Sequence, residues 1–165
     1  MTLETAESEK LGQITDFLNG MTSENGNALS QLSPDSLSAL YSMGYQLYRN
    51  GKYEDAKCFF RFLTLNNSFE RKYWMGLGAC YQMLKLYNEA IECYSAAAIQ
   101  DPTDPYVHLH AADCYFHMHN LAKAKEALES AMITAKDDKA YEGLIPKLQL
   151  ISDTWSNLPN GVSHD

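Results

Sequence analysis

The stretch that decides the fold is residues 71–104, RKYWMGLGACYQMLKLYNEAIECYSAAAIQDPTD. Counted from Arg71, large apolar side chains fall at positions 4, 7, 11, 17 and 24, and small ones at positions 8, 20 and 27. Pro102 follows at position 32. These spacings place the apolar side chains on one face of each of two successive helices. The stretch therefore predicts a helix–turn–helix unit.

The same pattern recurs before and after this stretch. The three copies span residues 37–70, 71–104 and 105–138. A period of 34 residues with these side chains is the tetratricopeptide pattern. The third copy is the weakest, because His108 replaces a large aromatic residue and Lys136 stands where the pattern has proline.

The spacing has a physical cause. Small residues occupy positions 8 and 20 of the three copies, namely Gly44 and Ala56, Gly78 and Ala90, and Ala112 and Ala124. They allow the two helices of one repeat to approach closely, while the large residues fill the space between neighbouring repeats. One helix pair cannot bury its apolar face alone, so the repeats must stack. We expect an all-α fold of three tandem repeats.

Composition excludes several functional classes. The net charge is −8 without a cluster of Lys or Arg, which argues against binding to nucleic acid or to an anionic membrane surface. No apolar run approaches the roughly 18 residues of a membrane span. The start, MTLETAESEK, is acidic and unlike a secretory signal. We expect a cytoplasmic protein without a cofactor.

The cysteines follow the repeat rather than a ligand motif. They are Cys58, Cys80, Cys93 and Cys114, and none forms a CxxC pair. Cysteine at a repeat position is best explained as a small buried apolar residue. Disulfides or a metal site are the alternatives, and reducing conditions in the cytosol disfavour the former.

Residues 1–36 are predicted to form an N-terminal helical segment. Leu11, Ile14 and Leu18 recur at helical spacing within a helix over residues 8–19. A helix this short is marginal alone and must pack on its own repeats or on those of a second chain. The second option predicts a homodimer held by these three residues.

Residues 139–158 are predicted to form a C-terminal capping helix. Their apolar face can close the exposed end of the last repeat. Pro146 must either kink this helix or begin a new segment. Residues 159–165 are expected to be a tail.

Catalytic motifs are missing from the sequence. It contains no glycine-rich phosphate loop, nucleophile elbow or HExxH, so we expect no enzyme. His110, Cys114 and His117 share one helical face and could hold zinc. No fourth ligand follows at a fixed spacing, so ordinary repeat residues are the favoured interpretation and no metal is expected.

The first helix of each tetratricopeptide repeat lines a concave groove, through positions 2, 5, 9 and 12. The candidate peptide-binding residues are Tyr41, Tyr45, Tyr48, Leu65, Met75, Ala79, Gln82, Leu109 and Phe116. The three tyrosines are additional to the core pattern. They either pack beneath the N-terminal helix or line a peptide groove, which tyrosine suits because it offers rigid contact area with a polar tip.

The groove positions also indicate the kind of peptide. Domains that clamp the C-terminal carboxylates of chaperones need Lys, Arg and Asn there, and this chain has Tyr41, Tyr45, Gly76, Tyr106 and His110. An apolar, extended, proline-containing segment fits better.

Two runs carry a resemblance to a known family. LYSMGYQLYRNGKYEDAKCFFRFL (40–63) and MGLGACYQMLKLYNEAIECYSAAAI (75–99) resemble the class II chaperones of type III secretion, the SycD, LcrH and IpgC type. The resemblance implies a bacterial cytosolic chaperone that holds hydrophobic translocator proteins before export. It also implies that a P-x-L-x-x-P segment of the client lies in the groove, and that N-terminal helices form dimers.

Two other functions stay open on the sequence alone. A general tetratricopeptide scaffold would join subunits of an assembly. A zinc or redox protein would use the histidine and cysteine residues of the third repeat.

Overall fold

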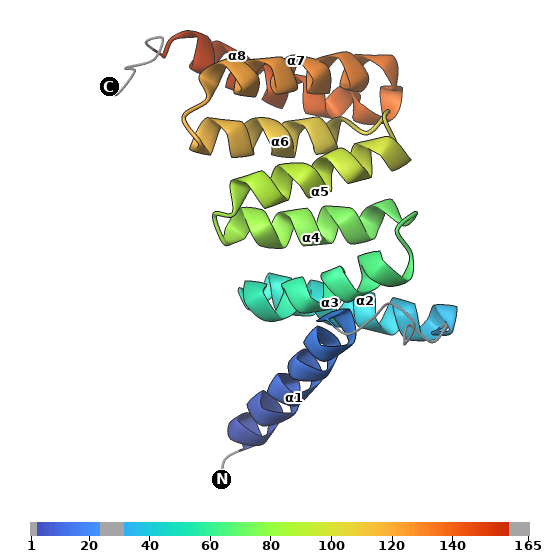
Figure 1. Cartoon of the computed structure of the whole chain (residues 1–165). Coiled ribbons are helices and arrows are strands. Elements are labelled where there is room, and N and C mark those ends of the chain that lie inside the picture. The colour runs from blue at the N-terminus through green and yellow to red at the C-terminus, as the bar shows by residue number, and fades with distance from the viewer. Residues whose placement is uncertain (1–2, 24–31, 159–165) are drawn as a thin grey trace. The chain divides into compact units, whose positions relative to one another are not determined.

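The computed structural model describes residues 3–23 and 32–158. Within these ranges every regular element is helical (Figure 1). The elements are α1 (Leu3–Ser23), α2 (Pro34–Arg49), α3 (Tyr53–Asn66), α4 (Arg71–Met83), α5 (Tyr87–Gln100), α6 (Pro105–His117), α7 (Leu121–Asp137), the 3₁₀ helix η1 (Lys139–Leu144) and α8 (Ile145–Ser156). The predicted all-α fold is confirmed over these ranges. The predicted tail, 159–165, lies outside the described residues.

The chain divides into two compact units, Met1–Leu84 and Lys85–Asp165, which are called unit 1 and unit 2. The division falls at the predicted turn of the second repeat. In a repeat array each repeat contacts only its neighbours.

In unit 1, α3 is the central helix, because it contacts α1, α2 and α4. The start of α2 is the one predicted from Ser33 and Pro34. The Ser33 hydroxyl oxygen accepts a hydrogen bond of 3.2 Å from the Ser36 N–H, and Pro34 lies in the first turn. Serine satisfies a free N–H at this position, and proline has none to satisfy.

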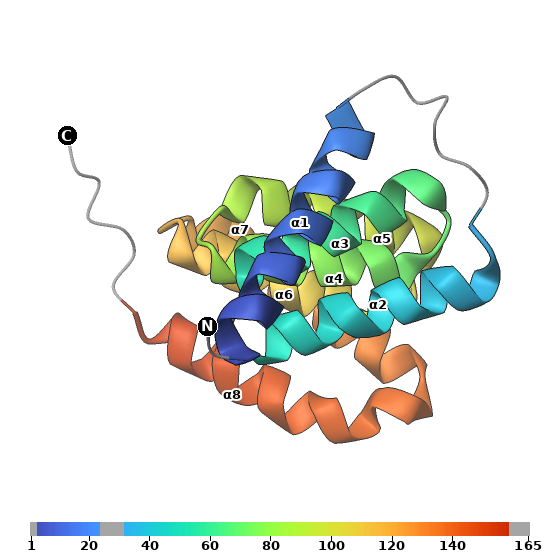
Figure 2. The same cartoon turned by 90° about the horizontal axis from the view of Figure 1, so that it is seen from below.

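Helix α1 is longer than predicted and packs on its own chain. It continues past the predicted end at Gly20 to Ser23. Leu18 is only 4% exposed and lies against Phe59 and Phe62 of α3. Partly buried side chains complete this cluster: Leu11, Leu32, Leu40 and Leu47. Figure 2 shows α1 crossing α3. Of the two options for this helix, the structure shows packing in cis.

Unit 2 is built around the α6–α7 pair and closed by α8. Its core contains the predicted small residues Ala112 and Ala124, both fully buried. The predicted C-terminal helix is divided into η1 and α8, and Pro146 lies in the first turn of α8. Pro146 therefore begins a new helix rather than kinking a continuous one. Its missing N–H is tolerated there, because the first N–H groups of a helix have no partner within the helix.

The three helical hairpins share one turn geometry. Gly51, Lys85 and His119 have φ values of 76°, 62° and 59°, and they recur at the repeat period. Each lies in the left-handed region, where glycine is tolerated best. In the first and third turns the following N–H, of Lys52 or Asn120, donates to a carbonyl five residues earlier, at 2.9 Å.

This geometry predicts opposite effects of two substitutions. His119→Gly should raise the free energy of unfolding by about 1 kcal/mol, because it removes the steric cost of a Cβ in the left-handed region. Gly51→Ala should lower it by a similar amount. Urea unfolding measures both, and His119→Ala is the control that keeps the Cβ. A His119→Gly variant less stable than His119→Ala would contradict the prediction.

Candidate functional site

Four aromatic rings from three helices of unit 1 form a cluster, the tyrosine cluster, around Tyr41. The Tyr41 ring stacks on Tyr45 of the same helix, with centroids 6.5 Å apart and planes 13° apart. It meets Phe60 of α3 edge-on at 5.8 Å and Tyr73 of α4 at 5.9 Å. The cluster therefore joins α2, α3 and α4.

Two glycines create the space for the phenylalanines of α3. A Cβ on Gly76 would lie 2.5 Å from Cε1 of Phe60, and one on Gly44 would lie 3.1 Å from Cβ of Phe59. Both distances are too short for a side chain without displacement of the neighbour. Gly44 was predicted as a close-approach residue, whereas Gly76 was not.

Exposure changes in steps through the tyrosine cluster. Phe60 is 1% exposed and Tyr73 is 3% exposed, Tyr41 is partly buried, and Tyr45 is 50% exposed. Tyr45 thus presents an aromatic ring to solvent on a base of buried rings. Aromatic rings supply large apolar contact area at binding surfaces.

Tyr48 occupies a different environment from Tyr45. Its ring packs edge-on against Tyr53 at the start of α3, with centroids 5.4 Å apart. Burial raises the pKa of its phenol, and the proximity of Cys80 adds to the increase. The predicted row of three tyrosines is therefore divided, with Tyr41 and Tyr45 in one stack and Tyr48 packed on α3.

The other predicted groove residues of unit 1 differ in position. Met75, Ala79 and Gln82 are partly exposed on α4. Leu65 is 49% exposed on α3. It lies five residues after Phe60, which places it about 140° around the helix axis. Leu65 therefore faces away from the tyrosine cluster.

In unit 2 the predicted groove residues contact the C-terminal helices. Leu109 and Phe116 of α6 pack against the core that α7 and α8 complete. The Phe116 ring stacks on Trp155 of α8, with centroids 4.8 Å apart and planes 2° apart. These two side chains are thus partly covered within their own unit.

The histidines of α6 stack on tyrosines of α5. His110 lies on Tyr94 at 5.1 Å, and His117 lies on Tyr87 at 5.4 Å. Nowhere in residues 3–23 and 32–158 do three or more His, Cys, Asp or Glu side chains gather so that they could hold a metal ion. The rings of His110 and His117 are thus engaged in stacking on tyrosines.

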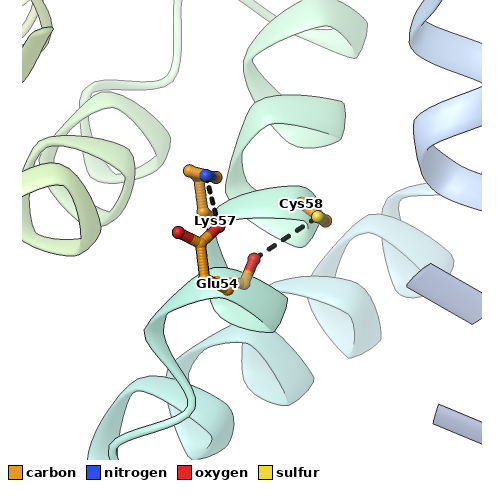
Figure 3. A network of polar contacts seen from close by, with 3 residues as sticks. All are labelled: Glu54, Lys57 and Cys58. Carbon is orange, nitrogen blue, oxygen red and sulfur yellow. Dashed lines mark hydrogen bonds and ion pairs between the residues drawn. The ribbon is translucent and has the colours of Figure 1, made fainter. Parts of the chain in front are cut away.

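All four cysteines are free and buried, which confirms their prediction as small apolar residues. Burial raises the pKa of the Cys93 and Cys114 thiols to about 12. The Cys58 thiol donates a hydrogen bond of 3.4 Å to the Glu54 carbonyl (Figure 3). Buried thiols with raised pKa values are poor nucleophiles and poor metal ligands.

Burial of His110 predicts a pH dependence of stability. Burial lowers the pKa of His110, and Lys147 adds to this effect while Asp113 opposes it. Below about pH 6.5, the usual pKa of histidine, the unfolded chain therefore binds more protons than the folded one. Stability should be complete above that pH and fall as the pH drops toward the pKa of the folded state.

Urea unfolding at pH 7.5 and pH 5.5 measures this effect. His110→Phe keeps a ring on Tyr94 but cannot be protonated, so it should lose less stability on acidification than wild type. His119→Gln, at an exposed histidine, is the control. An unchanged acid sensitivity in His110→Phe would refute the assignment.

Unit 1 also contains a pocket of about 470 Å³ between α1 and the start of α3. Leu11 and Gly12 line it from α1, and residues 51–55 line it from the first turn and α3. None of its lining residues belongs to the tyrosine cluster, so the two features are separate.

Comparison with known proteins identifies the family. Tetratricopeptide-repeat family profiles match residues 41–105 and 83–148. Low calcium response locus protein H of Yersinia pestis is 36% identical over 116 residues, which cover 70% of this chain and 69% of the relative. The type III secretion chaperone SycD of Yersinia enterocolitica, crystallised with a peptide of the translocator YopD, is 31% identical, with a TM-score of 0.72 over 77% of this chain and 97% of SycD.

This chain belongs to the translocator chaperones of type III secretion. A third similar protein is PcrH of Pseudomonas aeruginosa. In its complex with the chaperone-binding region of PopD, PcrH is 34% identical to this chain, with a TM-score of 0.73 over 76% of this chain and 94% of PcrH.

In this translocator chaperone, sequence reasoning missed three residues of the tyrosine cluster and its surroundings. The repeat pattern assigns Phe60 to packing between helices and does not specify Tyr73. Gly76 is predicted only to leave the groove without a positive charge at that position. One signal was available. The pair Phe59–Phe60 on the second helix is matched by glycines on both neighbouring helices, and such glycines mark a close approach.

Proposed function

We propose that this chain is a bacterial cytoplasmic chaperone that binds the hydrophobic translocator proteins of type III secretion before their export. The observation that carries the proposal is the half-exposed Tyr45 ring, which stacks on the partly buried Tyr41. It occurs in a chain whose relatives were crystallised with segments of PopD and YopD. Among the described residues no helix is long and apolar enough to cross a bilayer.

The mechanism is stoichiometric binding without catalysis. An extended client segment places apolar anchors, leucine or proline, on the rings of Tyr45 and Tyr41. The partly exposed Met75, Ala79 and Gln82 of α4 provide further contacts. Extended proline-containing segments suit such aromatic surfaces because little conformational entropy is lost on binding. Binding shields client surface that would otherwise aggregate or insert into membranes.

Co-expression tests the proposal against a general scaffold function. A translocator encoded beside this gene should be soluble with wild type and largely insoluble alone. A scaffold would leave its solubility unchanged. Calorimetric titration with a peptide of the form P-x-L-x-x-P should then give a 1:1 complex with the purified chain.

We also propose that a homodimer forms through the outer face of α1. Of the three predicted contact residues, two pack within the chain and one is exposed. Leu18 and Leu11 belong to the cluster with α3. Ile14 is 37% exposed and its neighbour Phe17 is 66% exposed. Ile14 and Phe17 are therefore available to a second copy.

Substitutions at Phe17 and Leu18, compared by sedimentation and thermal melting, distinguish a contact between two chains from packing within one chain. Phe17→Asp should shift the chain toward monomer at micromolar concentration with an unchanged melting temperature, because the side chain makes little contact within the chain. Leu18→Ala should instead lower the melting temperature, because it removes a buried contact to α3. If Phe17→Asp sediments like wild type, the proposed interface is wrong.

A further inference from the structure

One charged side chain lies beside the tyrosine cluster. In unit 1 the groove positions are Ser38, Tyr41, Tyr45, Tyr48, Lys72, Met75, Ala79 and Gln82, and only Lys72 among them is charged. Its ammonium nitrogen lies 5.3 Å from the ring centroid of Tyr41 and 5.5 Å from that of Tyr73. The cation thus lies over Tyr41, on which Tyr45 stacks, and over Tyr73.

Lys72 is held loosely enough to accept a second partner. Its ammonium is 3.2 Å from a carboxylate oxygen of Glu70, and the two side chains are 50% and 43% exposed. An exposed ion pair contributes at most about 1 kcal/mol. An ammonium group has three N–H donors, and the contact with the tyrosine faces uses the charge of the cation rather than its donors.

We propose that Lys72 is a specificity determinant that pairs with an acidic side chain of the bound segment. This inference rests on the proposed function, since it adds a charge to the apolar segment bound at Tyr45. The acidic residue is an aspartate or glutamate close to the anchor that packs on Tyr45. A chain of net charge −8 repels acidic peptides in general, so one cation at the site selects a single carboxylate in one position.

The chain offers a matched control for Lys72. Lys57 of α3 has its ammonium 6.0 Å from the ring centroid of Tyr81 and is paired with Glu54 (Figure 3). It reproduces the same combination of tyrosine face and glutamate partner. Because Lys57 lies on the second helix of its repeat, it is outside the groove positions.

The probe is a synthetic 12-residue peptide containing P-x-L-x-x-P with asparagine at every x, compared with three variants that each carry one aspartate. Calorimetric titration uses the full chain at low salt. One aspartate variant should bind wild type about 3- to 5-fold more tightly than the asparagine peptide, the upper part of the range for an exposed ion pair. This preference should shrink at 0.5 M NaCl because salt screens exposed charges.

The variants decide the assignment. Lys72→Gln should bind the aspartate and asparagine peptides equally well, whereas Lys57→Gln should keep the preference for aspartate. Lys72→Glu should prefer a lysine at the same peptide position. The inference is overturned if Lys72→Gln retains the preference, or if wild type binds the asparagine peptide and shows none. Failure of every peptide to bind wild type would overturn the proposed function as well.

Discussion

Tyr45→Ala should bind a translocator segment about 30-fold more weakly than wild type while unfolding at nearly the same temperature. Removal of an aromatic anchor from an interface typically costs about 2 kcal/mol or more, and about 1.4 kcal/mol corresponds to each tenfold change in affinity. Tyr45 is half exposed in the free chain, so its truncation removes little packing within the fold. Calorimetric titration and thermal melting measure the two effects separately.

Two controls give this prediction its meaning. Tyr41→Ala should weaken binding and also lower stability, because the Tyr41 ring contacts Phe60 and Tyr73. Leu65→Ala removes an equally exposed apolar side chain from the other side of α3 and should change neither quantity. Normal binding by Tyr45→Ala would move the client site away from the tyrosine cluster. Unfolding of Tyr45→Ala would make this ring part of the core.

Phe60→Ala should lower the free energy of unfolding by about 3–5 kcal/mol, the usual cost of emptying a phenylalanine site in a core. Phe60 is 1% exposed, and its ring fills the space that Gly76 leaves on α4 while it supports Tyr41. The effect is large because two backbones already approach this ring and cannot easily collapse further into the cavity. Urea unfolding monitored by circular dichroism measures it.

Phe69 supplies the control for that experiment within the same unit. It is 80% exposed in the loop between α3 and α4. Phe69→Ala should therefore change stability by no more than about 0.5 kcal/mol. Gly76→Ala tests the space from the opposite side, since its new methyl group would overpack Phe60. Equal stability of Phe60→Ala and Phe69→Ala would refute the packing described for α3 and α4.

The fold could be predicted because it repeats. A side-chain pattern with a fixed period specifies the helices, and the turns at Gly51 and His119 follow at the same position of each repeat. The partner of α1 could not be predicted. Helix α1 lies outside the repeats, so the repeat pattern does not specify what its apolar residues contact. Leu18 packs on Phe59 and Phe62, a surface that exists only once α3 has folded against its neighbours.

The site could be predicted only in part. Period and spacing place Tyr41, Tyr45 and Tyr48 on one helix, but their environments depend on which rings of other helices lie beneath them. Tyr48 has Tyr53 as its neighbour and Tyr41 has Phe60 and Tyr73. These are contacts between helices, and a pattern within one helix does not specify them.

The buried thiols allow local unfolding of this chaperone to be measured. Cys58 and Cys80 lie in unit 1, and Cys93 and Cys114 lie in unit 2. Cys80 and Cys114 are fully buried, so a thiol reagent can modify them only when the surrounding helices open. The rate of modification then measures the free energy of local opening at that repeat. Variants that keep only Cys80 or only Cys114 would show whether client binding changes the opening of the second or of the third repeat, and neither needs an added cysteine.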